Sequence, residues 1–314
     1  MKRLWAAAAL CALAVAAPRA ARADAVEPLG RPWRAVGPGV DVASVAELGG
    51  DAGWAARVVL VDPARAKFVV RFDPGKPTIA EWRKRYPGAL AIANGSFFSD
   101  DAGRVRPTCD LIADGKAVKG AGCHREDALY FGALPRPAPP KAAEPALVTV
   151  APHDRARPPA AQARTRDGGR HKAHEAVALA PAVKAPERPA PEVPRLLSAA
   201  DYRPADWIES LKSFPTLVHA GYPACVGFNY CAEASRTAAV AQLRDGRLLL
   251  FASQWSAVRK DVARFLAETL GAEEALNLDG GPEATLVLRD EEPDDGVANG
   301  KVGLPSVIVV LPNE

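Results

Sequence analysis

Residues 275–281 read Ala-Leu-Asn-Leu-Asp-Gly-Gly and place two polar side chains directly before two glycines. Apolar and polar residues alternate, which predicts a short strand with its leucines toward the core and its asparagine and aspartate on the other side. The glycines remove side chains, so a ligand or another backbone can approach closely. Pro282 then fixes the exit of the chain, and Glu283 places a second carboxylate nearby. An Asp-Gly hairpin turn without chemistry has the same spacing, so spacing alone leaves both interpretations open.

A second polar cluster has the same design. Residues 94–98 read Asn-Gly-Ser-Phe-Phe and follow a buried apolar run at 90–93. The two phenylalanines could pack in the core or stack on a sugar, and an Asn-Gly turn is the structural alternative. Farther along the chain, Arg236 opens a strand. A guanidinium suits a phosphate because its donors form a fork, although a lone arginine is more often a surface residue.

The surrounding sequence is rich in strands. We expect one hairpin from residues 57–62 and 67–72, a second around Asp114-Gly115, and a third around residues 244–246. Only two helices are indicated. One begins at Thr78 with capping-box spacing to Glu81, and one runs from Ser256 to Leu270. This pattern predicts an α+β fold with a mixed or largely antiparallel β-sheet core and a few flanking helices.

Residues 134–197 differ from both flanks in composition. They repeat Pro, Ala, Arg and Lys and contain no aromatic residue. Such a segment cannot bury enough surface to offset its ordering entropy, so we predict a disordered insert, with a short strand at 146–150 as one exception. The insert would divide one domain into a first part at 24–133 and a second part at 198–314.

The segment at 1–23 has the form of a secretory signal. Lys2 and Arg3 precede an apolar run, and Ala21-Arg22-Ala23 offers small residues for cleavage before Asp24. The run is too short to span a bilayer, so we expect a periplasmic or secreted protein without a transmembrane segment after cleavage.

Cleavage would remove one of the five cysteines and leave four. In an exported chain, four cysteines favour two disulfides, and three pairings are possible. Proximity in the sequence favours Cys109–Cys123 and Cys225–Cys231. A zinc site is disfavoured because no Cys-x-x-Cys motif occurs.

The basic charge of the chain is concentrated in two segments. The whole sequence has a net charge of +3, whereas the segment at 1–23 contains four basic and no acidic side chains. The segment at 134–197 contains eleven basic and six acidic side chains, so the remaining body has a net charge of about −6. A mildly acidic body argues against nucleic acid as the partner.

The order of these motifs along the chain resembles that of a known protein family. The sequence has NGSFF at 94–98, Asp-Gly at 114–115, Arg-Thr at 236–237, Asp-Gly-Arg at 245–247 and NLDGG at 277–281. This order resembles the phosphodiester glycosidase family over most of residues 89–133 and 215–311, and the Asn-x-Asp-Gly-Gly element is its most specific part. The resemblance implies an α+β fold and hydrolysis of a sugar-1-phosphodiester.

The resemblance also implies site residues. The matched positions are Asn94, Arg236, Asn277, Asp279, Gly280 and Gly281. We expect Asp279 to be the principal catalytic carboxylate, Glu283 a weaker second candidate, and Arg236 the residue that neutralises the phosphate. Asn94, Ser96 and Asn277 would hold sugar hydroxyls or phosphate oxygens.

Two further interpretations accompany the enzyme hypothesis: a binding protein without catalysis, and a structural protein tethered through the basic insert at 134–197. A carbohydrate- or polymer-binding envelope protein could retain the fold without catalysis, because Pro-Glu-Ala at 282–284 replaces the small hydroxylated residue common after the double glycine. No cofactor is expected. Calcium is a lesser alternative at Asp100, Asp101, Asp294 and Asp295, where solvated loop acids are the better interpretation.

Overall fold

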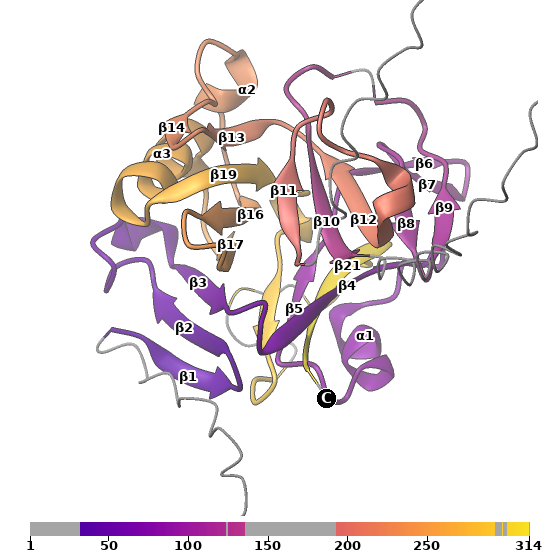
Figure 1. The fold of residues 1–314 in the computed structure, drawn as a ribbon, viewed down its shortest axis with the longest axis horizontal. Coiled ribbons are helices and arrows are strands. Elements are labelled where there is room, and N and C mark those ends of the chain that lie inside the picture. The colour runs from indigo at the N-terminus through magenta and orange to yellow at the C-terminus, as the bar shows by residue number, and fades with distance from the viewer. Residues whose placement is uncertain (1–31, 124, 136–192, 293–296, 298–299, 314) are drawn as a thin grey trace, which may run out of the picture.

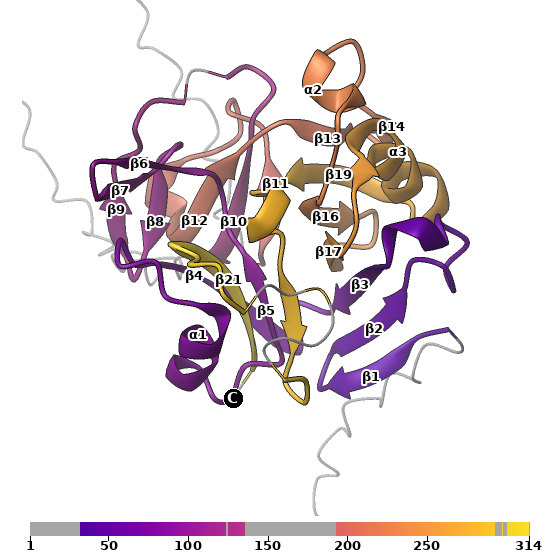
Figure 2. The same cartoon turned by 180° about the vertical axis from the view of Figure 1, so that it is seen from behind.

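Antiparallel sheets dominate the computed structural model, which describes residues 32–123, 125–135, 193–292, 297 and 300–313. Every pairing between the described strands is antiparallel, as the sequence predicted for most of the core. Figures 1 and 2 show the largest sheet on one side of the molecule and the smaller sheets on the other. The predicted α+β class is confirmed.

The largest sheet has eight strands. In spatial order they are β1 (Arg34–Gly37), β2 (Val40–Ser44), β3 (Ala56–Val61), β17 (Leu248–Ser253), β16 (Ala238–Leu243), β19 (Ala272–Asn277), β13 (Thr216–His219) and β14 (Tyr222–Pro223). Strands from before and after residues 136–192 therefore pair in one sheet, since β3 lies beside β17.

The remaining strands form smaller sheets. A five-stranded sheet contains β11 (Arg195–Leu197), β10 (Leu129–Pro135), β12 (Trp207–Ser213), β8 (Leu111–Ala113) and β9 (Lys116–Val118). A four-stranded sheet contains β20 (Leu286–Leu288), β5 (Ala91–Asn94), β21 (Ser306–Pro312) and β4 (Ala66–Phe72). Two short pairs are β6 (Phe98–Asp101) with β7 (Arg104–Pro107), and β15 (Ala234–Ser235) with β18 (Ala257–Val258).

Strand β19 shows how the alternating sequence builds the core. Leu276 and Leu278 belong to the central apolar cluster, which is shared by all three large sheets. Ala272 and Ala275 face the opposite side and join a second cluster under α3 (Arg259–Arg264). Asn277 is fully buried rather than exposed, because β13 and β16 lie on either side of it.

Helices cover the outer faces of two sheets. Helix α1 (Ile79–Arg85) packs Ile79 and Trp82 on the four-stranded sheet, and its N-terminus has the predicted capping box between Thr78 and Glu81. Helix α3 continues into η3 (Phe265–Thr269) and ends before Gly271. It starts later than the sequence predicts, because residues 257–258 first form strand β18.

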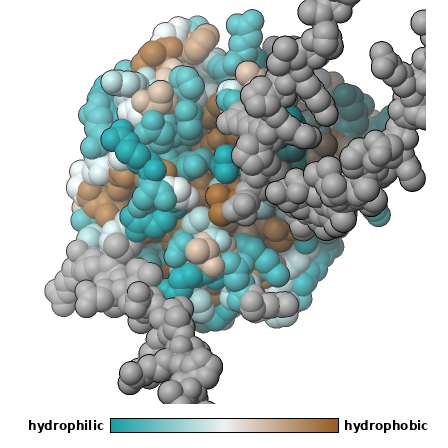
Figure 3. Space-filling model, viewed as in Figure 1, coloured by the Kyte–Doolittle hydropathy of each residue, from teal (hydrophilic) through white to brown (hydrophobic). Residues whose placement is uncertain are grey.

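The short helices connect the strands. They are η1 (Ala52–Trp54), η2 (Pro204–Asp206), α2 (Asn229–Ala232) and η4 (Gly281–Glu283). No helix in the described part of the chain is long and apolar enough to cross a membrane. The face in Figure 3 is mostly hydrophilic with smaller apolar patches.

Two of the three predicted hairpins are confirmed. Strands β8 and β9 turn at Asp114-Gly115, where both residues have positive φ, and β16 and β17 turn at residues 244–247. The hairpin expected from residues 57–62 and 67–72 is wrong. Strand β3 already has β2 and β17 on its two edges, so β4 enters a different sheet and pairs with β21.

Both ends of the segment predicted as an insert, residues 134–197, belong to strands. Residues 134–135 belong to β10, and residues 195–197 form β11, which pairs with β10. Leu196 is buried in the central cluster, which explains why this end of the segment joins the fold. The possible strand at 146–150, the segment at 1–23, and Asp294 and Asp295 lie outside the described residues.

Both predicted disulfides are present. Cys109 is bonded to Cys123 with a Cα–Cα distance of 4.8 Å, and Cys225 to Cys231 with 5.5 Å. Each bond closes a short loop, as sequence proximity predicted. The loop closed by Cys225–Cys231 includes part of α2.

Candidate active site

The two polar strand ends meet in space. Strand β5 ends at Asn94 and β19 at Asn277, and the segments that follow are hydrogen-bonded to each other. The Asn94 Nδ2 donates a hydrogen bond to the Asp279 carbonyl oxygen at 2.8 Å, and the Asp279 N–H donates to the Gly95 carbonyl at 3.0 Å. Segments 185 residues apart in the sequence therefore form one junction.

At this junction the polar groups at the end of β5 form hydrogen bonds within the protein. Asn94 is 1% exposed, and its Oδ1 accepts a hydrogen bond from the Thr285 N–H at 3.0 Å. The Ser96 carbonyl accepts a bond from the Ser306 hydroxyl at 3.1 Å. Asn94 therefore bridges two loops, and a ligand could bind its amide only by exchanging these bonds. The buried Ser96 Oγ has no partner among the described residues.

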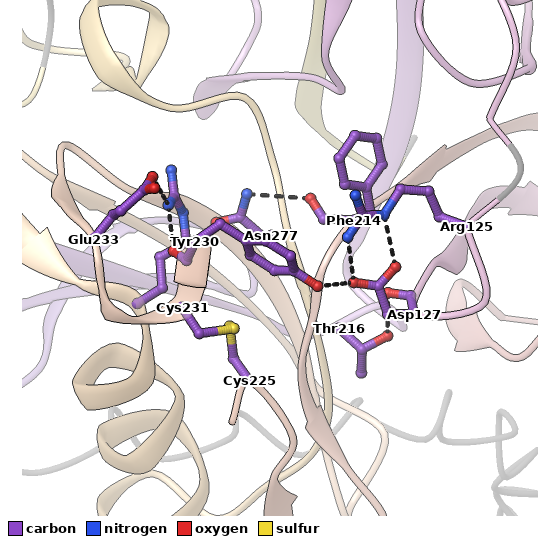
Figure 4. Close-up of a disulfide and its surroundings, with 10 residues drawn as sticks. Arg125, Asp127, Phe214, Thr216, Cys225, Tyr230, Cys231, Glu233 and Asn277 are labelled. Carbon is purple, nitrogen blue, oxygen red and sulfur yellow. Dashed lines mark hydrogen bonds and ion pairs between the residues drawn. A yellow bond between two sulfur atoms is a disulfide. The ribbon is translucent and has the colours of Figure 1, made fainter. Parts of the chain in front are cut away.

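Asn277 is engaged in a similar way. Its Nδ2 donates to the Leu278 carbonyl at 2.7 Å and to the Phe214 carbonyl at 3.3 Å, as Figure 4 shows for the second contact. Its Oδ1 is buried and lacks a partner in the described part of the structure. One acceptor of the predicted substrate-binding pair thus remains unsatisfied, which is unusual for a buried polar atom.

Asp279 differs from both asparagines because its side chain is only partly buried. One carboxylate oxygen accepts a bond from the Gly280 N–H at 2.9 Å. Burial, together with the nearby Glu283 charge, raises the pKa of Asp279 to about 7. A carboxyl group that titrates near neutrality can exist in either form at physiological pH, which suits acid, base or nucleophilic chemistry.

The double glycine shapes the chain between these two carboxylates. Gly281 has φ +64°, a left-handed conformation that glycine tolerates best. It begins η4, which contains Glu283. A Cβ atom built on Gly281 would lie 3.9 Å from the Glu283 Oε2, so the Glu283 carboxylate lies near Gly281. This position explains the effect of Glu283 on Asp279.

Arg236 lies against the same segment. Its carbonyl accepts a hydrogen bond from the Gly281 N–H at 2.9 Å, and its Nη2 donates to the Ala284 carbonyl at 2.5 Å. Burial lowers the pKa of Arg236, and Glu283 acts in the opposite direction. No carboxylate in the described part of the chain is within ion-pair distance of this guanidinium. A partly buried cation without a bonded anion favours binding of a negatively charged group.

The sequence analysis missed two residues next to Gly280. A Cβ built on Gly280 would lie 3.7 Å from the Arg259 Nη2 and 3.9 Å from the Ser235 Oγ. Arg259 begins α3, and Ser235 lies in β15, so neither is near the double glycine in sequence. The only sequence signal was a basic residue at a helix start, which is common on protein surfaces.

The arrangement combines carboxylates with guanidinium groups. The described residues contain no cluster of three or more His, Cys, Asp or Glu side chains that could hold a metal ion. Asp100, one of the predicted calcium candidates, instead pairs with Lys76 at 2.5 Å. The site residues can therefore supply a titrating carboxyl group and anion-binding donors.

Comparisons with known proteins agree with this chemistry. A family model described as phosphodiester glycosidase matches residues 157–311. That range contains Arg236 and NLDGG at 277–281, whereas NGSFF at 94–98 lies outside it. No curated protein matches the sequence.

The chain was compared with solved structures, and one of them, at a TM-score of 0.50, shares its fold. The catalytic domain of zebrafish N-acetylglucosamine-1-phosphodiester alpha-N-acetylglucosaminidase, auto-inhibited by its pro-peptide, has a TM-score of 0.50 and 16% identity over 82% of this chain and 77% of that one. A Burkholderia pseudomallei protein has a TM-score of 0.47 and 16% identity over 82% and 74%. A Synechocystis protein has a TM-score of 0.45 and 13% identity over 82% and 59%. The family comparison thus links residues 157–311, about half of the chain, to the phosphodiester glycosidase family.

Proposed function

We propose that this protein is a hydrolase that cleaves a sugar-1-phosphodiester at the bond between the anomeric carbon and the phosphate oxygen. The observation that supports this most strongly is the position of Asp279. Its partly exposed carboxyl group has a pKa raised to about 7 and lies on the loop whose N–H groups and carbonyls contact Arg236. The family supplies the class of reaction.

The reaction consumes one water molecule. The C1–O bond of the sugar breaks, the sugar gains a hydroxyl group, and the phosphate leaves as a monoester together with a proton. Asp279 acts on the anomeric carbon as a nucleophile or on water as a base, and either role requires its ionised form. A phosphate is a good leaving group, so protonation of the leaving oxygen matters less than in an ordinary glycoside.

Glu283 and Arg236 assist this carboxylate. Glu283 keeps the pKa of Asp279 raised, so the Asp279 carboxyl group titrates close to neutral pH. Arg236 places a desolvated positive charge beside the same loop, where it neutralises the phosphate. The substrate is a sugar-1-phosphodiester of an envelope or extracellular glycan.

Export is the second part of the proposal. The segment at 1–23 carries the signals for secretion, and the two disulfides need an oxidising compartment. A periplasmic or secreted location follows. Expression with the signal, followed by cell fractionation and intact-mass measurement, would show mature protein beginning at Asp24; full-length protein retained in the cytoplasm would contradict export.

The test of the activity replaces Asp279 with Asn, which retains the acceptor for the Gly280 N–H. The parent is first assayed on methyl phosphodiesters of several sugar-1-phosphates. We expect Asp279→Asn to lower kcat/KM by on the order of 10³-fold or more, as the loss of a catalytic carboxylate does elsewhere. Asp290→Asn, an exposed aspartate in a turn, is the control for the change in charge. Parent-like turnover by folded Asp279→Asn would contradict the assignment.

A non-catalytic carbohydrate-binding protein is the second candidate. It is favoured by Asn94 and Asn277, whose amide groups already bind backbone carbonyls. This candidate predicts that the parent binds sugar phosphates, measured by calorimetry, without releasing sugar. Release of sugar by the parent and its loss in Asp279→Asn would exclude it.

A further inference from the structure

We infer that Arg259, whose guanidinium lies beside Gly280, is a second phosphate-binding residue. The inference rests on the proposed function and adds a residue that contacts the leaving phosphate.

Arg259 lies at the double glycine although it belongs to another element. A Cβ built on Gly280 would lie 3.7 Å from the Arg259 Nη2 and 2.8 Å from the Arg236 carbonyl oxygen. The Arg236 guanidinium extends toward Ala284, at the other end of the turn. Arg259 therefore lies near Gly280 at one end of this segment and Arg236 bonds to Ala284 at the other, and Gly280 leaves the space beside Arg259 free of a side chain.

The Arg259 guanidinium has more N–H donors than assigned acceptors. It carries five N–H bonds, and two acceptors are assigned to it: the Tyr230 carbonyl at 2.7 Å and the Ser235 Oγ at 2.9 Å. Its Nε is buried and has no partner in the described part of the chain. A buried guanidinium donor without an acceptor is costly, and a bound anion would satisfy it.

The charge on Arg259 is also poorly compensated. The carboxylate within ion-pair distance belongs to Glu233, at 4.0 Å. The Glu233 side chain is 67% exposed, whereas that of Arg259 is 13% exposed. A solvent-exposed glutamate at this distance gives a weak ion pair, so the buried cation remains available to an anionic ligand.

A rigid support holds the Tyr230 carbonyl in place. The Tyr230 hydroxyl donates a hydrogen bond to Asp127, and Arg125 donates two bonds to the same carboxylate at 2.8 and 2.9 Å (Figure 4). The Cys225–Cys231 disulfide closes the loop that contains Tyr230. Arg259 is thus fixed before any ligand arrives, which lowers the entropy cost of binding.

This position gives Arg259 a role in the reaction. Cleavage of the C1–O bond turns a phosphodiester with one negative charge into a monoester that acquires a second one. A guanidinium fixed at the phosphate stabilises this developing charge more than it stabilises the substrate. Loss of Arg259 should therefore lower kcat as well as weaken binding of the phosphate product.

The experiment measures binding of methyl phosphate, the phosphate part of a simple product, by calorimetry. We expect Arg259→Gln to weaken its Kd by about 10- to 100-fold, the effect of one lost charge-assisted contact. Arg264→Gln is the matched control, because Arg264 lies on the same helix, is 59% exposed and pairs with Asp261. Its Kd should stay within about twofold of the parent. Neutral methyl glycoside should bind all three proteins equally.

Each result decides the inference. A parent that does not bind methyl phosphate, or an Arg259→Gln protein that binds it like the parent, would overturn it. If Arg259→Gln does not fold, Arg259→Lys is used, which keeps the charge but loses the fork; unchanged affinity would again overturn the inference. Phosphate binding that depends on Arg259 in a parent without turnover would refute the proposed hydrolysis and leave the binding site standing.

Discussion

The ends of β5 and β19 look alike in sequence and differ in the structure. Both strands are buried and both run into asparagine, glycine and a further polar residue. At the β5 end, Asn94 has its amide bonded to Asp279 and Thr285. At the β19 end, Asp279 keeps a partly exposed carboxylate with a raised pKa. The end of β5 therefore joins two loops by hydrogen bonds, whereas the end of β19 leaves a carboxylate accessible to a ligand.

This contrast assigns stability to one end and chemistry to the other. A buried amide with all its bonds inside the protein stabilises the fold, and its loss leaves backbone groups unpaired. A carboxylate whose charge is disfavoured by burial reduces stability and is retained for another reason. Substitutions at the two ends should therefore act on different properties.

The largest stability effect is expected at the β19 end and depends on pH. The pKa of Asp279 is raised in the folded protein, so the native state binds the proton more tightly, and stability falls as pH rises from about 4 to 7. We expect Asp279→Asn to remove this loss and to be more stable than the parent at pH 8 by at most about 4 kcal/mol. Urea unfolding at pH 5 and pH 8 measures it; a parent and variant with the same pH slope would show that the Asp279 pKa is ordinary.

At the β5 end we expect a substitution to lower stability, by a smaller amount than Asp279→Asn raises it. Asn94→Ala removes two hydrogen bonds and leaves the Thr285 N–H and the Asp279 carbonyl unpaired, which should destabilise the protein by about 2–4 kcal/mol. The kcat of the protein that remains folded should stay within about tenfold of the parent. Thermal melting and turnover at low temperature test this together. A stable Asn94→Ala protein without activity would instead make Asn94 a substrate-binding residue.

A finer test separates the two carboxylates. Because Glu283 raises the pKa of Asp279, Glu283→Gln should lower that pKa and shift the rise of kcat/KM to lower pH. The pH profile of kcat/KM measures the shift, with Glu273→Gln, on the far end of β19, as the control for lost charge. An unshifted profile with reduced activity would make Glu283 a direct participant rather than an electrostatic neighbour.

The smallest effect is expected from the segment between β10 and β11. These strands pair with each other, so a linker of about eight Gly and Ser residues can replace residues 136–192. Activity and melting temperature should change little, because β10 and β11 form no hydrogen bond with a site residue in the described part of the chain. A loss of turnover on this replacement would show that the segment contributes to the site.

The sequence predicted local structure better than long-range pairing. The capping box at Thr78, the turns at 114–115 and 244–247 and both disulfides depend on residues close in the chain. The pairing of β3 and β4 was wrong because a strand partner depends on which edges are already occupied. Two apolar runs that end in polar residues before glycines predicted a site, and the structure brings these two ends together.

The roles within the site needed three-dimensional information. The amide of Asn94 could be assigned only when its partners, up to 191 residues away, were known. Arg259 gave only a weak signal in the sequence, because its approach to Gly280 depends on how α3 packs on the sheet. Asp279 was singled out by its motif, whereas its raised pKa depends on burial and on the fold of the Glu283 turn.

The most direct measurement is an NMR titration of the Asp279 carboxyl carbon in the folded parent, assigned by comparison with Asp279→Asn. We predict a midpoint near pH 7 that falls in Glu283→Gln. A midpoint near 3.8, the ordinary value for aspartate, would contradict the account, since the β19 end would then carry an unremarkable solvated acid rather than a group prepared for chemistry.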